Sequence, residues 1–210
     1  MLFNSYAFIF AFLPIVFFGF FLIARRSAAT AAAWLGLASL FFYGYWSIKA
    51  LPLLLGSVCV NYLFSKKLSP RDVGDDHARK VFLVIAVAAN LVLLGFFKYA
   101  NFFIANVNVA LEALSVNQAS VLNIVLPIGI SFFTFTQIAF LVDSYQGKVR
   151  KRNFIHYLLF VTYFPHLIAG PVLHHSQMMP QFAKPETYRI DLGKVAMGIG
   201  ILTVGLSKKL

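Results

Sequence analysis

Charged residues, and acidic ones above all, are scarce in this sequence of 210 residues. Only 12% of the residues are charged and seven are Asp or Glu, whereas 60% are apolar and 24 are Phe. A typical soluble domain has about 25% charged residues, so this composition excludes an ordinary soluble fold. Long apolar windows recur from end to end, without the strand-length alternation that a transmembrane barrel needs. We therefore predict an all-α, polytopic transmembrane protein.

Cysteine and the common catalytic motifs are also lacking. Cys59 is the single cysteine, so these residues can form neither an internal disulfide nor a cysteine-based metal cluster. The sequence has no GxxxxGK[ST] phosphate loop, no GxSxG nucleophile turn, no HExxH zinc motif and no CxxC pair. These absences exclude the most easily recognised soluble enzymes, and we expect no bound cofactor and no metal.

Apolar runs of about 17 to 25 residues are long enough to cross a bilayer. The first run lacks the basic start of a secretory signal, so we expect it to be a retained helix. The alternatives are about seven spans, or six spans plus one re-entrant segment. The predicted runs are Ala7 to Ala24, Ala28 to Trp46, Leu51 to Phe64, Val81 to Phe97, Val121 to Val142, Phe154 to Leu173 and Val195 to Leu206.

The net charge of +11 comes from short basic clusters between apolar runs, a pattern that indicates membrane topology rather than nucleic-acid binding. An external N-terminus with all seven runs spanning puts thirteen of the eighteen basic residues in the cytoplasm. If residues 154–173 instead enter the membrane and return, Lys184, Arg189 and Lys194 become cytoplasmic and the count is fourteen. Charge alone leaves both topologies open.

Two connecting segments are polar enough to lie outside the apolar runs. Residues 69–80, SPRDVGDDHARK, read as a solvated loop, with His77 as a surface histidine. Residues 98–118 are amphipathic, so we expect them either to lie along the membrane surface or to extend the fourth helix.

Ser131, Thr134 and Gln137 follow one another at three-residue intervals after Pro127 and Gly129. This spacing places the three polar side chains on one helix face, which we expect to point inward. Two interpretations stay open: hydrogen bonding between helices, or the polar wall of a substrate passage.

Residues 164–181, FPHLIAGPVLHHSQMMPQ, bring three of the five histidines together with two proline breaks. Proline removes backbone donors, so a segment broken in this way at membrane depth needs protein or water partners for its freed backbone groups. Three interpretations stay open: a core hydrogen bond for His166, interfacial positions for the other two histidines, or a polar pocket. The candidate cavity-lining residues of this block are His166, Gly170, Pro171, His174 and His175.

Four ordered motifs give the sequence a strong family resemblance: LGFFKYANFF, LPIGISFFTFTQIAFLVDSYQG, FPHLIAGPVLHHSQMMPQF and GLSKKL. Together they resemble the alginate O-acetylation branch of the membrane-bound O-acyltransferase family, over essentially the whole chain. His166, His174 and His175 stand where the branch pattern has Gln, Arg and an aromatic residue, a departure that bears on the acceptor.

The resemblance implies transfer of an acyl group, commonly acetyl, from a thioester donor such as acetyl-CoA or an acyl carrier to a polysaccharide hydroxyl. It also implies a bacterial inner-membrane location, contact with membrane lipid and a possible periplasmic acetyltransferase partner, with no role for nucleic acid. The family's catalytic histidine lies in an HGxxW segment beyond the GLxKK motif, and these residues stop at Leu210. We therefore expect residues 1–210 to be an incomplete N-terminal portion of the family's domain that lacks the catalytic residue.

Two alternatives do not involve acyl transfer. The broken segment and the Gln137 face also suit a polysaccharide or lipid export component, and the chain could equally be a noncatalytic membrane scaffold. The seven acidic residues fall in loops or at the ends of apolar runs, which argues against proton-coupled transport.

Overall fold

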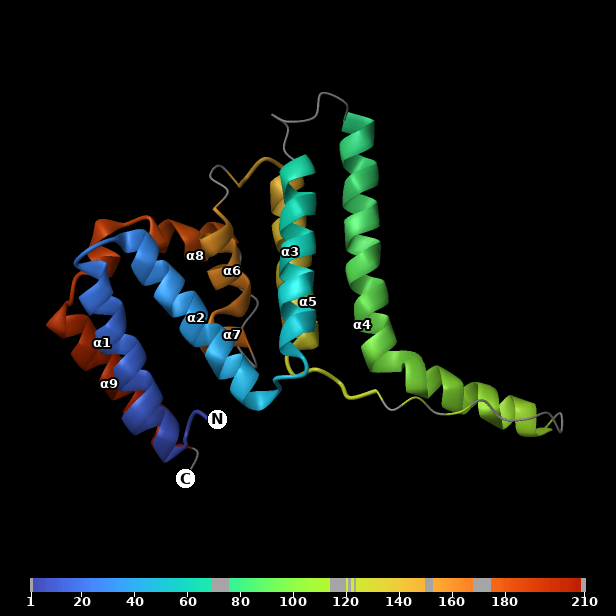
Figure 1. Cartoon of the computed structure of the whole chain (residues 1–210), viewed down its shortest axis with the longest axis horizontal. Helices are drawn as coiled ribbons and strands as arrows, with labels where there is room; N and C mark the ends of the chain where they lie inside the picture. Colours follow the sequence, from blue (N-terminus) through green and yellow to red (C-terminus); the bar gives the residue numbers. More distant parts are fainter. Residues whose placement is uncertain are drawn as a thin grey trace.

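The computed structural model describes residues 2–68, 76–113, 120, 122, 124–149, 153–167 and 175–208. These residues form helices joined by turns, and none of them lies in a strand, in agreement with the predicted all-α class (Figure 1). The helices are the π-helical turn η1 (Phe8–Phe12), α1 (Leu13–Ala24), α2 (Ala28–Trp46), α3 (Leu51–Lys67), α4 (Asp76–Ala113), α5 (Ile130–Tyr145), α6 (Phe154–Thr162), α7 (Phe164–Leu167), α8 (His175–Phe182), the 3-10 turn η2 (Pro185–Tyr188) and α9 (Leu192–Ser207).

The first two helices form an antiparallel pair around a close contact between a glycine and a tryptophan. The Trp34 indole Nε1 donates a hydrogen bond of 3.2 Å to the carbonyl oxygen of Val16. Gly19 leaves room for the same ring, because a Cβ at this position would lie 2.8 Å from two of its carbons. Small residues allow helix backbones to approach closely in lipid, where packing rather than water drives association.

We expect Gly19→Ala to lower the free energy of unfolding by about 1 to 3 kcal/mol, because the added methyl displaces Trp34 from its hydrogen bond. Thermal unfolding of the detergent-solubilised protein measures this loss. Gly56→Ala is the matched control, since a Cβ there meets nothing within 4 Å. Equal unfolding temperatures for the two variants would contradict the close contact.

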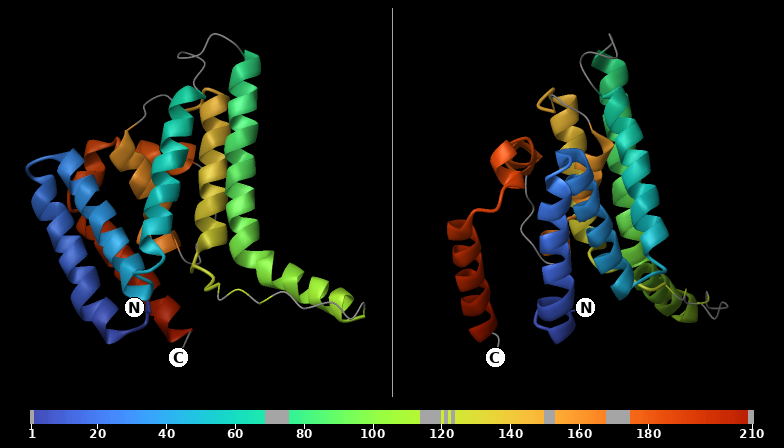
Figure 2. Two further views of the ribbon diagram at one scale, coloured as in Figure 1. Left: turned by 45° about the vertical axis from the view of Figure 1, so that its right-hand side comes forward. Right: turned by 60° about the vertical axis from the view of Figure 1, so that its left-hand side comes forward.

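Helices α3, α4 and α5 form a second group beside this pair (Figure 2). Figure 1 shows that α4 bends partway, and its second part runs sideways away from the bundle. Asn101 on α4 exchanges two hydrogen bonds with the backbone of Leu122, which ties the chain leading into α5 to this part of α4. Residues 98–113 of the amphipathic segment thus extend the fourth helix, as one of the two expectations had it, and residues 114–118 lie outside the described residues.

The structure changes the limits of several predicted spans. The fifth begins nine residues late, at Ile130, because Pro127 lacks a donor and Gly129 adopts a left-handed backbone (φ 74°) just before the helix. The sixth is broken into α6 and α7. Among the described residues, two helices are long and apolar enough to cross a membrane, Ala28–Trp46 and the Asp76–Val109 part of α4, so the predicted number of spans is not confirmed.

The predicted solvated loop 69–80 is also partly wrong. Its last five residues, from Asp76, are the first turn of α4, and Arg79 is buried there with 9% of its surface exposed. His77 is exposed, as predicted. Residues 69–75 lie outside the described residues.

The bundle has two clearly different ends (Figure 1). The α1–α2 turn, the C-terminal end of α3, the N-terminal end of α4 and helix α8 lie at one end. The two chain termini and the α2–α3 turn lie at the other. Helix α9 stands apart from the rest in Figure 2, and none of its residues is buried.

Candidate functional site

The polar face of α5 points into the bundle. Thr134 and Gln137 are completely buried and Ser131 is half-buried, so the predicted inward direction of this face is confirmed. Most of the other buried residues of α5, including Phe133 and Phe140, lie on the same side of the helix. Whether the three polar residues line a substrate cavity stays a prediction.

Gln137 belongs to a cluster of buried side chains that joins α3, α4 and α5. Its Oε1 accepts hydrogen bonds from Ser57 Oγ at 3.1 Å and from Asn61 Nδ2. Asn61 and Asn90 bond to each other in both directions, at 2.6 and 3.1 Å. Sequence reasoning missed Asn61 and Asn90, although a lone amide inside an apolar run is a signal of such bonding. The contacts of Gln137 support hydrogen bonding between helices.

The break between α6 and α7 frees a backbone N–H, which bonds to a side chain of a neighbouring helix. Helix α6 ends at Thr162, and Tyr163 turns the chain (φ −53°, ψ 110°) just before the Phe164-Pro165 pair. The backbone N–H of Phe164 donates instead to Ser39 Oγ of α2 at 3.2 Å. A polar group from a neighbouring helix therefore compensates the interruption.

His166 sits inside this turn and is 8% exposed. Its Nε2 lies 3.1 Å from the carbonyl oxygen of Phe160, and its ring centre lies 5.4 Å from that of Tyr163. The contact with Phe160 is the core hydrogen bond that the sequence left as one alternative. Nδ1 is buried and has no hydrogen-bond partner among the described residues. Gly170, Pro171 and His174 lie outside the described residues.

His175 begins α8 and lies against aromatic rings, with centroid distances of 5.0 Å to Phe140 and 5.5 Å to Phe160. Burial lowers the pKa of His175 to about 4, Asp143 acts in the opposite direction, and His156 lowers it further. No sequence pattern indicated a carboxylate near the histidines, because Asp143 lies in the last turn of a different helix, α5. Among the described residues, no three His, Cys, Asp or Glu side chains gather as a metal ion would require.

The pKa of His175 predicts a loss of stability in mild acid. The folded protein keeps the imidazole neutral down to about pH 4, whereas the unfolded chain takes up the proton near pH 6.5. Between these values the unfolded state binds more protons, so stability falls as pH falls. Thermal unfolding midpoints measured from pH 7.5 to pH 4.5 test this, and His175→Gln should flatten their decline.

The exposed His77 provides the control, and His77→Gln should leave the decline unchanged. Parallel curves for the His175→Gln variant and the unmodified protein would show that another group causes the acid sensitivity.

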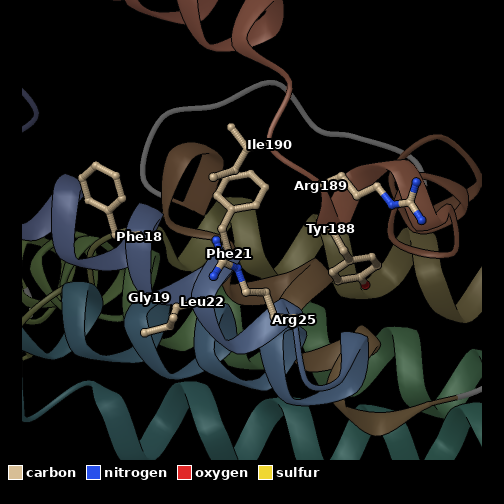
Figure 3. A pocket seen from close by; sticks show the side chains of 8 residues that line it. All are labelled: Phe18, Gly19, Phe21, Leu22, Arg25, Tyr188, Arg189 and Ile190. Atoms are coloured by element: carbon tan, nitrogen blue, oxygen red, sulfur yellow. The ribbon is translucent and has the colours of Figure 1, made fainter.

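Three hollows on the described surface lie away from these candidate residues. One of about 480 Å³ lies between α1 and residues 188–190, which include the end of η2 (Figure 3). Another, of about 530 Å³, shares Arg25, Tyr188 and Arg189 with it. The third, of about 460 Å³, is an apolar hollow between η1–α1 and α2.

Comparison with known proteins identifies the family to which this chain is similar. Residues 76–210 match the membrane-bound O-acyltransferase family. The chain is 39% identical to a peptidoglycan O-acetyltransferase of Helicobacter pylori, covering 100% of this chain and 44% of that protein. It is 35% identical to proteins named probable alginate O-acetylase AlgI from Pseudomonas syringae pv. tomato and Pseudomonas putida, covering 100% of this chain and 39% and 42% of theirs.

The chain thus spans about two fifths of the length of the curated relatives it matches. No solved structure matches it. Because the family match covers well over half of the residues and the curated relatives align with all of them, this chain belongs to the membrane-bound O-acyltransferase family.

Proposed function

We propose that this chain is part of an O-acetyltransferase that moves an acetyl group from a thioester donor to hydroxyls of a cell-envelope polysaccharide. The observation that carries the proposal is the identity of 35–39%, along the whole chain, to proteins named for O-acetylation of two such polymers. Acetyl-CoA or an acyl carrier supplies the thioester. Alginate and peptidoglycan are the two acceptor classes that the relatives suggest.

In the proposed reaction the acceptor hydroxyl oxygen attacks the thioester carbonyl. A histidine takes the hydroxyl proton, the ester forms and the thiol leaves. Positioned proton transfer of this kind contributes roughly 10² to 10⁴ in rate. We expect this histidine in an HGxxW segment outside residues 1–210, because neither His166 nor His175 stands in that sequence context.

The proposed topology is the one with a re-entrant segment at residues 154–173. Helix α6 has nine residues and α7 has four, each too short to cross a bilayer. Arg25 and Arg189 border the same hollow, which supports placing residues 184–194 on the same membrane side as the α1–α2 turn. The positive-inside rule then makes this side cytoplasmic and the N-terminus external, in the bacterial inner membrane.

Deleting the gene that encodes this sequence tests the reaction. Ester-linked acetate should disappear from either the exopolysaccharide or the peptidoglycan, and the polymer that loses it is the acceptor. The complete reading frame should restore the acetate, whereas the same frame with the HGxxW histidine replaced by alanine should not. Unchanged acetate in both polymers would refute the proposal.

The same strains separate acetyl transfer from the alternative roles. An export component would change the amount of secreted polymer and not its acetate per sugar. A scaffold for a periplasmic acetyltransferase would restore acetylation even with the HGxxW histidine replaced.

A further inference from the structure

The second part of α4 leaves the helix bundle. The buried residues of α4 follow one another at intervals of four or seven, which places them on the face toward α3 and α5; they are Arg79, Ala86, Asn90 and Leu94. Of the later α4 residues whose burial the structure describes, none is buried. Figure 1 shows the second part of α4 running sideways. Residues 98–113, the lateral part of α4, are therefore not packed into the described bundle.

The lateral part has one polar face, which the chain itself contacts. Its polar residues are spaced three, seven and four residues apart, so they share one helix face; they are Lys98, Asn101, Asn108 and Glu112. The side chain of Asn101 exchanges two hydrogen bonds, of 2.9 and 3.2 Å, with the backbone of Leu122. The chain that leads into α5 therefore contacts the polar face, and apolar residues occupy most of the other sides.

The described residues leave the apolar sides of the lateral part largely uncovered. Phe102 is 62% exposed, Phe103 is 64% exposed and Val109 is 70% exposed. Asn106 lies among these residues, and its Nδ2 donates a hydrogen bond of 2.7 Å to the carbonyl oxygen of Phe102, within the same helix. An amide group that is already bonded costs less free energy to remove from water. These sides therefore suit an apolar environment better than water.

Aromatic and basic residues mark the level at which α4 bends. The first part of α4 belongs to a helix that is long and apolar enough to cross a membrane. In Figure 1 the bend lies at the same end of the bundle as the α2–α3 turn, where the exposed Tyr45 and Trp46 end α2. At the start of the lateral part, the Nζ of Lys98 lies 5.3 Å from the ring centre of Tyr99. Trp, Tyr and Lys gather where hydrocarbon meets water, so the lateral part leaves the bundle at this boundary.

The lateral part carries no net charge. Lys98 and Glu112 are its only charged residues. A helix that lies on a membrane is held by the apolar area that it buries and, where it is basic, by attraction to anionic headgroups. Only the first of these contributions is available to residues 98–113, so the surface that they fit is the boundary between headgroups and acyl chains, without a preference for acidic lipids.

We propose that the lateral part of α4 is an in-plane helix that binds the membrane surface. Phe102, Phe103 and Val109 insert among the lipid chains, and the face that bears Asn101 turns toward water. Through the bonds between Asn101 and Leu122, this helix holds the connection to α5 at the membrane surface. The inference depends neither on acetyl transfer nor on which end of the bundle is cytoplasmic.

Spin labels on the complete protein in phosphatidylcholine liposomes test this placement. After serine replaces the native cysteines, Phe103→Cys and Glu112→Cys each carry a nitroxide, one on the apolar side and one on the polar face. The accessibility of the label to oxygen, divided by its accessibility to a water-soluble nickel chelate, should be several-fold higher at position 103 than at position 112. Across a cysteine scan of residues 99–112, this ratio should rise and fall with the period of a helix.

The exposed His77→Cys provides the reference for a label in water, and its ratio should be close to that at position 112. Val107→Cys is a second labelled variant on the apolar side, in case Phe103→Cys does not fold. A lateral part that projects into water would give equally high chelate accessibility at positions 103 and 112, and this would overturn the proposal. Low accessibility to both reagents at position 103 would show that another protein segment covers it, which also rejects lipid. In phosphatidylglycerol liposomes the ratios should be the same, and insertion only there would show attraction by charge and contradict the apolar basis.

Discussion

Replacing Arg79 with methionine should lower the free energy of unfolding by about 3 kcal/mol or more. Methionine keeps most of the side-chain volume but leaves the oxygens to which Arg79 donates without that donor. Hydrogen bonds to a charged group are worth about 1.5 to 3 kcal/mol each, and an unsatisfied buried polar atom costs about 1 to 3 kcal/mol. Chemical unfolding of the purified protein in mixed micelles measures the loss.

The expected size of this loss in the free energy of unfolding follows from the position of Arg79 between three helix ends. Its Nε donates to the carbonyl oxygen of Leu68, just after α3, at 3.2 Å. Its Nη2 donates to the carbonyl oxygen of Tyr145, at the end of α5, at 2.6 Å, and the guanidinium lies 4.8 Å from the Tyr145 ring centre. These carbonyls end their helices and have no next turn to bond to. One side chain of α4 thus satisfies the ends of two neighbouring helices.

Two further variants separate this bonding from simple charge. Arg79→Lys keeps the charge but cannot reproduce the planar fork, so it should recover only part of the stability. Lys80→Met removes a neighbouring exposed charge and should change little. The ion pair with Asp76 contributes little, because the Asp76 side chain is 76% exposed. If Lys80→Met destabilised as much as Arg79→Met, general electrostatics would be the cause.

The apolar runs were sufficient to predict most of the helices, because composition alone indicates a helix long and apolar enough to cross a membrane. Their limits were harder to predict. The beginning of α5 was marked in the sequence by Pro127 and Gly129, and a stricter use of these breakers would have found it. The first turn of α4 was not predicted, because residues 76–80 have the composition of a polar loop. Only the tertiary contacts of Arg79 explain why these residues are helical.

The candidate site was also predicted only in part. The spacing of Thr134 and Gln137 was enough to predict their inward direction, because it depends on one helix alone. The partners of Gln137 depend on which helices become neighbours, and no local pattern contains that information. Likewise, the closeness of Asp143 to His175 results from how α8 packs against α5, although 31 residues separate the two in the sequence.

The buried amides allow the two interpretations of the α5 polar face to be separated. Asn61→Leu removes the donor to Gln137 and both bonds to Asn90, leaving two buried amides poorly satisfied. We expect a loss of about 2 kcal/mol in the free energy of unfolding, above the average of about 0.6 kcal/mol for one interhelical pair because several bonds are lost together. Unfolding in mixed micelles again provides the measurement, with the exposed Asn106→Leu as control.

Replacing the whole amide set should be less harmful than replacing one member. In the variant that combines Asn61→Leu, Asn90→Leu and Gln137→Met, no amide is left unpaired, so most of the stability should return. If the cluster only holds α3, α4 and α5 together, this variant in the complete protein should also keep its acetyl ester formation. A stable variant without acetylation would instead favour Gln137 and its neighbours as the polar wall of a substrate passage.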